Sequence, residues 1–426
     1  MLLHSIRVSL MAFAAALILT ACGGGSSTKP EPPVGGISLV EGDSQVTVTW
    51  TETPGVEYWI FTSPNNPNLT LSNWLASAGS TYKLKVTSPY VVTGLTNDTP
   101  YSFFLTGRIK GGPGSDATPT KIAKPRLAGI DWTTTTATLN TGNKTAITYG
   151  YYLDASTNTY VYKYAAAGNG GLMFNASEIT TWTSVTSPVT SDLSAAEFSF
   201  AKFIAVGAGG KIVTSTVTST DSQTWTQATS GTTENLNAIA SNGSRVVAVG
   251  NNGSIITSTD AVTWQAATSV PSPTSHLYGV TYAASGKWLA VGVGGTILTS
   301  TDGLTWTGTS QTSGITANLK GVAAISTTLN SVITYTYVAM GANGTMHTSS
   351  DATSWTSNVA TSFSLNAMAA ANQFVAVGNN GTIITSSDGA TWTTRTSNIN
   401  ENLTSIVRAN NQYIAVSDSG RVIYSK

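Results

Sequence analysis

Cysteine and histidine are almost missing from this sequence, whose 426 residues include one Cys and three His. Zinc clusters, disulfide frameworks, Cys/His catalysis and covalent haem attachment all need several such residues at defined spacings. The composition therefore excludes these classes of site. We expect neither a bound metal ion nor an organic cofactor.

Charged residues are also scarce. Asp, Glu, Lys and Arg make up 9% of the chain, against about 25% in an average soluble protein. The 20 basic residues balance the 20 acidic ones, so the formal net charge is zero. Nucleic-acid binding relies on a basic face, and we therefore expect no nucleic-acid partner.

What the chain does contain is typical of turn-rich all-β proteins outside the cytoplasm. Hydrophobic residues make up 41% of it, enough for sizeable cores, and Ser, Thr, Asn and Gly dominate the polar remainder. At roughly 100 to 200 residues per domain, the length predicts two or three domains. We expect a monomer.

Residues 1–21 have the pattern of a signal peptide. Arg7 precedes an apolar run of about a dozen residues, Val8 to Leu19, which is too short for the roughly 20 residues that cross a bilayer as a helix. The following LTACG, residues 19–23, resembles the lipobox of bacterial lipoproteins. The alternative is an ordinary signal peptide followed by a chance cysteine.

The lipobox resemblance implies that Cys22 carries the lipid and that Gly23 favours retention in the outer membrane. Residues 22–36 are rich in Gly, Ser and Pro, which predicts a flexible tether. We therefore expect a lipid-anchored protein of the bacterial outer membrane or cell surface, held at the membrane without spanning it.

Residues 37–120 show the alternation of half-buried strands, separated by Pro, Gly and Asn clusters. The stretch VVTGLTNDTPY, residues 91–101, resembles the corner of a fibronectin type III domain. That resemblance implies a β-sandwich in which Trp50 fills the core and the Tyr101 hydroxyl bonds backbone near Leu95. Such a domain is either a spacer or a binding module in its own right.

From residue 127 to residue 426 the sequence repeats. Each unit contains an Ala-x-Gly element, with Ser417 in place of Gly in the last unit, and most units contain Ser-Thr-Asp-x-x-Thr-Trp or a close variant. Seven units of about 43 residues have the length of four-stranded propeller blades. The last unit lacks its fourth strand, whereas an unmatched Asp131-Trp132 stands at the start of the region. We therefore predict that the strand near Trp132 completes the last unit and closes the ring.

The repeated Asp motif resembles the Asp box of sialidase-like propellers, in the shorter form of the photosystem II stability/assembly factor family. The resemblance implies an all-β fold, a fibronectin type III sandwich followed by a seven-bladed propeller. We expect structural roles for the motif carboxylates, because near-identical copies do not give one acid a distinct environment to tune its pKa. These carboxylates are Asp221, Asp260, Asp302, Asp351 and Asp388.

The residues that differ between repeats are the candidates for ligand contact. If the first strand of each unit is innermost, the loop leading into it lines one mouth of a central channel. Polar side chains there suit a sugar, a peptide or a partner loop, and the alternative is a ring of solvated loops around water. The residue after the first Leu varies as Ser194, Asn237, Tyr278, Lys320, Asn366 and Thr404, and the leading loops add Asp192, Glu234, His276 and Glu401.

Enzymatic alternatives lack the residues that they need. A sialidase-like site requires three convergent arginines, and the repeats contain only Arg245, Arg395, Arg408 and Arg421 after Leu127. An inverting glycosidase needs two carboxyl groups about 6.5 to 9.5 Å apart, for which Glu234 and Glu401 are the only candidates. We expect a non-catalytic protein that recognises a glycan or a protein at the cell envelope; the alternatives are a glycoside hydrolase and an envelope assembly factor.

Overall fold

The computed structural model describes residues 29–110, 112–139, 145–154, 159–216, 224–270, 275–308, 315–409 and 411–425. They divide into a unit that ends at Ala128 and a second unit, Gly129–Ser425. The expected signal peptide, Cys22 and Asp221 lie outside the described residues. Within the described ranges there is no helix long and apolar enough to cross a membrane.

The first unit consists of two antiparallel sheets and one short 3-10 helix, η1 (Trp74–Ala76). Strands alternate between the sheets along the chain, as in a sandwich. One sheet has the order β1 (Ser38–Gly42), β2 (Gln45–Thr49), β5 (Tyr90–Thr93), and the other has the order β4 (Thr81–Val86), β3 (Glu57–Pro64), β6 (Tyr101–Arg108), β7 (Lys121–Ala123).

Aromatic side chains fill the core of this unit. Trp50 is buried and packs edge-on against Tyr58, with ring centroids 5.6 Å apart. The Tyr101 hydroxyl accepts a hydrogen bond from the Thr96 backbone N–H at 3.1 Å. This confirms the predicted bond to backbone near Leu95.

The segment expected to be a free tether is in part attached to the first unit. Pro30 and Pro33 are buried. The Lys29 ammonium pairs with Asp116 at 2.6 Å, and a turn joins the Gly36 N–H to the Pro33 carbonyl at 3.0 Å. Proline rings are apolar and lose little conformational entropy on burial, so the folded unit begins before the predicted boundary at residue 37.

The second unit contains seven sheets in its described residues, numbered here in chain order of their first strands. Sheet 1 is β9 (Thr145–Asp154), β10 (Thr159–Gly168), β11 (Met173–Glu178) and β12 (Thr181–Val185); sheet 2 is β13 (Leu193–Ser199), β14 (Lys202–Gly207), β15 (Ile212–Thr216) and β16 (Trp225–Ala228); sheet 3 is β17 (Leu236–Ser241), β18 (Val246–Gly250), β19 (Ile255–Ser258) and β20 (Gln265–Ala266).

The remaining sheets follow the same order. Sheet 4 is β22 (Leu277–Tyr282), β23 (Trp288–Gly292), β24 (Ile297–Ser300) and β25 (Thr305–Thr307), with β21 (Thr268–Val270) added in parallel at its edge; sheet 5 is β26 (Leu319–Leu329), β27 (Val332–Gly341), β28 (Thr345–Ser349) and β29 (Thr356–Val359); sheet 6 is β30 (Leu365–Ala370), β31 (Phe374–Gly378), β32 (Ile383–Ser386) and β33 (Thr393–Arg395); sheet 7 is β34 (Leu403–Ala409), β35 (Gln412–Ser417), β36 (Arg421–Ser425) and β8 (Trp132–Thr138).

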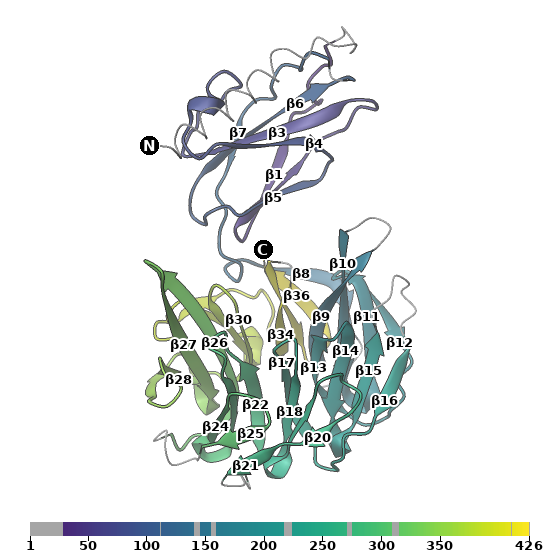
Figure 1. Ribbon diagram of the computed structural model, residues 1–426, viewed down its shortest axis with the longest axis vertical. Coiled ribbons are helices and arrows are strands. Elements are labelled where there is room, and N and C mark those ends of the chain that lie inside the picture. The colour runs from purple at the N-terminus through teal and green to yellow at the C-terminus, as the bar shows by residue number, and fades with distance from the viewer. Residues whose placement is uncertain are drawn as a thin grey trace. The chain divides into compact units, whose positions relative to one another are not determined.

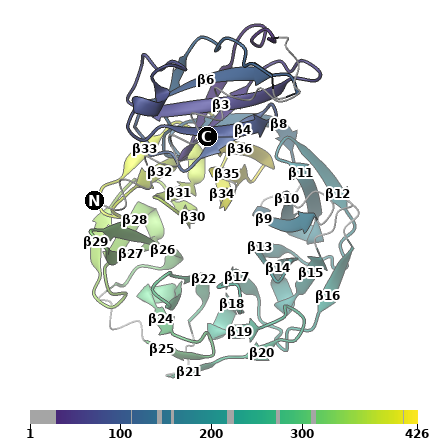
Figure 2. The same cartoon turned by 45° about the horizontal axis from the view of Figure 1, so that its top comes forward.

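These sheets form a ring with their first strands innermost (Figure 2). Each first strand contacts the first strand of the next sheet, and β34 contacts β9. The second strands of sheets 2, 3, 4, 6 and 7 are almost completely buried, because neighbouring sheets pack face to face through Val, Ile, Leu and Ala side chains. Burying one such large aliphatic side chain contributes roughly 1.5 to 3 kcal/mol, so the sheet-to-sheet interfaces are the main source of stability in the ring.

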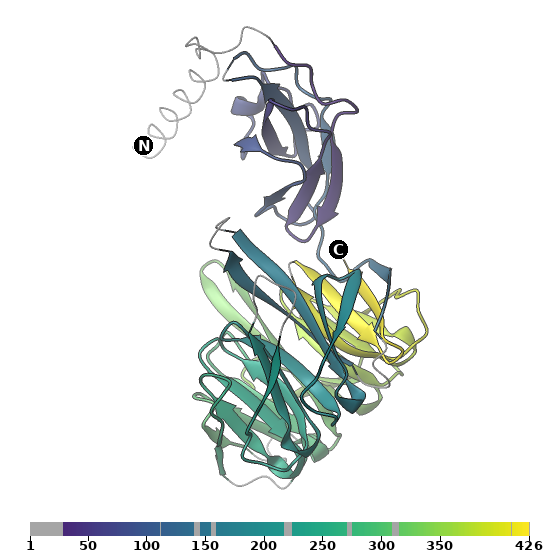
Figure 3. The ribbon, with the colours of Figure 1, turned by 90° about the vertical axis from the view of Figure 1, so that its right-hand side faces the viewer.

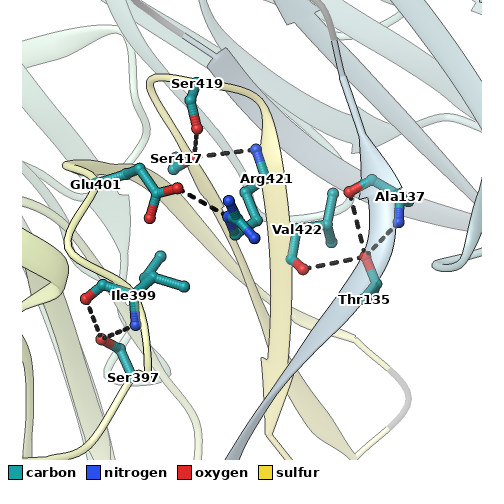
Figure 4. Close-up of polar contacts among 9 residues, drawn as sticks. All are labelled: Thr135, Ala137, Ser397, Ile399, Glu401, Ser417, Ser419, Arg421 and Val422. Atoms are coloured by element: carbon teal, nitrogen blue, oxygen red, sulfur yellow. Dashed lines mark hydrogen bonds and ion pairs between the residues drawn. The ribbon is translucent and has the colours of Figure 1, made fainter.

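Strand β8 closes the ring. It pairs antiparallel with β36, Trp132 opposite Ser425 and Thr134 opposite Ile423. The Thr135 hydroxyl adds a hydrogen bond to the Val422 carbonyl at 3.1 Å (Figure 4). The pairing confirms the prediction that the strand near Trp132 completes the last unit, and it leaves β36 without an open edge.

Short 3-10 turns join the second and third strands of sheets 1 to 6. They are η2 (Asn169–Gly171), η3 (Ala208–Gly210), η4 (Asn251–Gly253), η5 (Val293–Gly295), η6 (Ala342–Gly344) and η7 (Asn379–Gly381). In η4, Asn252 and Gly253 both have positive φ, and the Ser254 N–H closes the turn on the Asn251 carbonyl at 2.9 Å. Positive φ at both central residues is the geometry of a type I′ turn, for which Asn-Gly is a preferred sequence.

The 3-10 turns η3 to η7 are each bonded to the loop that leads into the first strand of their own sheet. In sheets 2 to 7 a backbone N–H after the second strand donates to the carbonyl of the residue before the first Leu, at 2.8 to 3.0 Å. Glycine ends the second strand because a Cβ at Gly250, for example, would lie 2.1 Å from that carbonyl oxygen. This contact, which we call the leading-loop clamp, explains the recurrent Ala-x-Gly.

Two hairpins between first and second strands are longer than the others. Pairing in β9–β10 continues to Asp154 opposite Thr159, and in β26–β27 to Leu329 opposite Val332. Both hairpins extend beyond the same side of the ring (Figures 1 and 3). Their outer parts carry exposed apolar side chains, including Leu153, Leu329 and Ile333.

Ring closure by β8 can be tested by comparing a chain that starts at Arg126 with one that starts at Asn140. Both lack the first unit, but only the shorter chain exposes the edge of β36. We expect its melting temperature to be lower by about 10 °C or more, since Trp132 and a full strand ladder are lost. Equal melting temperatures in calorimetry would contradict the closure.

Candidate functional site

The predicted variable residues occupy equivalent places in the ring. In sheets 2 to 7 the pairing of first and second strands shifts by one residue directly after the first Leu. The residue at the shift is therefore a β-bulge, which turns its side chain away from the regular alternation. The bulge residues are Ser194, Asn237, Tyr278, Lys320, Asn366 and Thr404.

Three of the bulge residues bond the ring itself: the Thr404 hydroxyl donates to the Val416 carbonyl of its own sheet at 3.3 Å, and two asparagines each bond two partners. The Asn237 amide Nδ2 donates to Asn251 Oδ1 at 3.0 Å and to the Leu277 carbonyl of the next sheet at 2.9 Å. Asn366 makes the same two contacts, with Asn379 and Leu403, both at 2.9 Å. Since both amide protons are used, these side chains have no hydrogen left to donate to a ligand.

Tyr278 and Lys320 are different. Both side chains are half-buried, and within the described residues neither the phenol oxygen nor the Lys320 Nζ has a hydrogen-bond partner. The ring of Tyr278 lies 6.3 Å from that of His276. These two bulges therefore present an aromatic ring with a hydroxyl, and a cation, that can contact a ligand.

His276 takes a position that bonds neighbouring sheets together. Its Nδ1 accepts a hydrogen bond from the Asn252 backbone N–H at 3.1 Å, in the turn of the preceding sheet. The side chain two residues before the bulge makes the equivalent contact elsewhere, through Asp192, Asn235, Asn318 and Asn402 at 2.7 to 3.1 Å. A histidine that is protonated on both nitrogens cannot accept a hydrogen bond. Protonation at Nδ1 for use as a general acid would therefore break the bond from Asn252.

Glu234 and Glu401 are each held by a neighbouring side chain. Glu234 Oε2 accepts from Asn252 Nδ2 at 3.0 Å, and Glu401 Oε1 accepts from Arg421 Nε at 2.9 Å (Figure 4). Burial raises the pKa of Glu401, but hydrogen bonds from its own backbone N–H and from Arg421, with the charge of Arg421, outweigh burial and lower it. The general acid of a glycosidase needs the opposite shift.

The Asp-box carboxylates bond backbone, as in Asx turns. Oδ1 of Asp260 accepts from the Val262 and Thr263 N–H groups, both at 2.7 Å. These bonds, that of Thr263 first, lower the pKa of Asp260 to about 2, and the same pattern lowers the pKa of the other described Asp-box acids. Those acids are Asp302, Asp351 and Asp388.

Glu197 is a residue that the sequence reasoning did not single out. It lies in the innermost strand β13, opposite Ile204, and is half-buried. Its Oε1 accepts the Phe198 N–H at 2.9 Å, but burial dominates and raises the pKa of Glu197 to about 7. The available signal was an acid inside a first strand, a position where the other repeats carry mostly apolar or small side chains. Among the described residues, no group of three or more His, Cys, Asp or Glu side chains could hold a metal ion.

The role of His276 as an acceptor predicts a difference between two substitutions. His276→Asn restores the side chain found in sheets 3, 5 and 7 and should leave the free energy of unfolding within about 0.5 kcal/mol of the native value. His276→Ala leaves the Asn252 N–H without its partner and should cost about 1 kcal/mol. Urea unfolding measures both, and equal stability of the two variants would contradict the role.

Burial of Glu197 predicts a pH-dependent effect on stability. The folded-state pKa of about 7 lies above the ordinary 4.5, so the native protein loses stability as the pH rises from about 4.5 to 7. Glu197→Gln cannot ionise and should be more stable than the native protein by up to about 3 kcal/mol at pH 8, with no such gain at pH 4. Denaturant unfolding at both pH values, with exposed Glu178→Gln as the control, tests this; a difference that is independent of pH would refute it.

Comparison with known proteins identifies a fold. No known family profile matches the chain, and no curated protein sequence resembles it significantly. Among solved structures, YCF48 bound to D1 peptide superposes with a TM-score of 0.51 at 17% identity, covering 71% of this chain and 99% of that one. YCF48 from Cyanidioschyzon merolae gives 0.51 at 13% identity, covering 69% and 98%.

An enzyme is also among the similar structures. A catalytically inactive virginiamycin B lyase from Staphylococcus aureus with quinupristin superposes with a TM-score of 0.51 at 12% identity, covering 70% of this chain and 99% of that one. A WD40 propeller domain of Doa1 is similar at 12% identity. At these identities the likeness concerns the fold alone. This all-β chain contains a β-propeller.

Proposed function

We propose that this chain is a lipid-anchored, non-catalytic binding protein, and that its propeller binds a segment of a partner protein at the cell envelope. The observation that carries the proposal is the contrast between adjacent positions. The leading-loop clamp repeats from sheet to sheet, whereas the bulge beside it changes and in two sheets presents Tyr278 and Lys320 without hydrogen-bond partners among the described residues. A rigid ring with varied side chains at one end is the arrangement of a recognition surface.

The similar structures support a binding or assembly role. YCF48 is bound to a D1 peptide, and another propeller of similar fold belongs to a mitotic checkpoint complex. A peptide suits the mouth because Tyr278 supplies a flat apolar ring with a hydroxyl and Lys320 supplies a cation. A glycan is the alternative ligand, since the same groups can stack on a sugar ring and bond its hydroxyls.

The carboxylates support the non-catalytic part of the proposal. The candidate pair for glycoside hydrolysis, Glu234 and Glu401, is engaged by Asn252 and Arg421. The described Asp-box acids all bond backbone in the same way. A hydrolase would need one acid with a raised pKa facing a second carboxylate across a cleft, and Glu234 and Glu401 lie on sheets 3 and 7, which are not neighbours in the ring.

The remaining parts of the proposal concern architecture and location. We propose seven blades, one for each sheet of the ring, and a fibronectin type III sandwich as the first unit, for which the Tyr101 bond and the two-sheet topology are the support. The lipobox around Cys22 supports anchoring at the outer membrane or cell surface, where the first unit would act as a spacer. We propose a monomer.

Binding of the purified protein to peptide and glycan arrays tests the function. We expect peptide ligands, and a Tyr278→Ala/Lys320→Ala double variant should bind them at least tenfold more weakly, about 1.4 kcal/mol. Lys121→Ala, an exposed lysine on β7 of the first unit, is the matched control. Undiminished binding by the double variant would exclude the mouth, and ligands found only among glycans would favour the alternative. Hydrolysis of any polysaccharide that Glu234→Gln or Glu401→Gln abolishes would overturn the non-catalytic proposal.

A further inference from the structure

A pocket lies at the end of the ring opposite the leading loops, beside the turn between β13 and β14. Its volume is about 330 Å³. Sheets 1, 2 and 3 all contribute to its wall, so the pocket lies where their first strands end. The lining includes Tyr151 of β9, Glu197, Phe198 and Ser199 of β13, and Ser241 and Gly243 of sheet 3.

The Glu197 carboxylate is the charged group of this pocket. Within the described residues its only hydrogen bond is the one from the Phe198 N–H, and no Lys, Arg or His forms an ion pair with it. Burial raises the pKa of the Tyr149 phenol of β9, with added contributions from Tyr162 and Tyr151 and a smaller one from Glu197. The Arg408 guanidinium acts in the opposite direction and lowers the pKa of Tyr149. It lies over the Tyr413 ring, 5.0 Å from the ring centroid. When Glu197 is ionised, its charge therefore has no counter-ion among the residues that the structure describes.

Two aromatic rings line the same pocket. The centroids of Tyr151 and Phe198 are 5.6 Å apart, and their planes are tilted by 49°. Phe198 is fixed against the backbone of Gly150, where an added Cβ would lie 2.3 Å from the ring. Tyr151 is 45% exposed, so one wall of the pocket is open to solvent. Ring faces carry partial negative charge and attract cations within about 6 Å of the centroid.

Hydroxyl oxygens complete the lining. Ser199 Oγ and Ser241 Oγ share a hydrogen bond at 2.8 Å. Ser241 Oγ also accepts the Gly243 N–H at 2.9 Å, and Ser199 directly precedes the turn between β13 and β14, in which Phe200 and Ala201 both have positive φ, at 53° and 55°. Non-glycine residues adopt this conformation at a cost. The surrounding fold therefore holds Phe200 and Ala201 in a backbone conformation that these residue types disfavour.

We propose that this pocket binds the basic side chain of a polypeptide, lysine or arginine, with the cation between the Glu197 carboxylate and the rings of Tyr151 and Phe198. A cation matches every part of the lining: it pairs with the carboxylate, it is attracted to both ring faces, and its N–H groups can donate to the serine oxygens. A neutral sugar would use the rings and hydroxyls but would leave the buried charge uncompensated. The inference rests on the proposed function only in that the ligand is a polypeptide.

The test uses small probes, so that it does not depend on the natural partner or on the mouth. NMR titration of the purified full chain with Nα-acetyl-lysine N-methylamide and its arginine analogue should give saturable binding. The glutamine analogue, which has no charge, should bind at least tenfold more weakly. Glu197→Gln and Tyr151→Ala should each weaken binding of the basic probes at least tenfold. Glu178→Gln, the same change at an exposed position of β11, should leave it unchanged.

Several outcomes would overturn the inference. Absence of saturable binding by the basic probes would do so, and so would equal binding of the lysine and glutamine analogues or undiminished binding by Glu197→Gln. Saturable binding of glucose or N-acetylglucosamine in preference to the basic probes would assign the pocket to sugars instead. None of these results bears on the Tyr278 and Lys320 variants, so failure of this inference and failure of the proposed function can be distinguished.

Discussion

The leading-loop clamp is the interaction on which the rest of the ring depends. In each of sheets 2 to 7 one carbonyl before the first strand accepts the N–H that follows the second strand, at 2.8 to 3.0 Å. The approach is close enough that a Cβ at Gly207 or Gly292 would lie 2.0 Å from the carbonyl oxygen. The clamp sets where the first strand begins, and with it the point at which each sheet meets the next. At Gly207 and Gly292 glycine is favoured for space and not for its φ, which is extended; in sheet 7 Ser417 takes the same place.

Structural and variable positions lie within three consecutive residues at the clamp. The residue that supplies the carbonyl also bonds the preceding sheet through its side chain, as Asn235 does at 2.8 Å and His276 does at 3.1 Å. The next residue is the buried Leu, and the one after it is the bulge. A change at the bulge alters no backbone hydrogen bond of the ladder. The ring can therefore vary Tyr278 or Lys320 without loss of the contacts that hold its sheets together.

Much of the fold could be predicted from the sequence, and less of the site. Repeat spacing and alternation located the strands, and the unmatched Trp132 predicted closure, because both depend on patterns that lie within the chain. The bulge at Asn237 was not foreseen, since a period of two does not reveal which residue lacks a partner. Its hydrogen bond to the Leu277 carbonyl was missed because that bond joins separate sheets. Glu197 was missed although an acid inside a first strand is visible in the sequence, because the burial that raises its pKa depends on the folded ring.

The scarcity of charge gives Glu197 its significance. Other acids of the ring have bonded partners, as Glu401 has in Arg421, Glu234 in Asn252, and Asp388 in backbone N–H groups. In a chain that is 9% charged, an acid without a counter-ion is not screened by a surrounding network. Ionising it inside the fold costs free energy at neutral pH, and a glutamine of the same shape would remove that cost. A carboxylate in this position therefore lowers the stability of the free protein, and a cation bound between it and the adjacent rings would offset the loss.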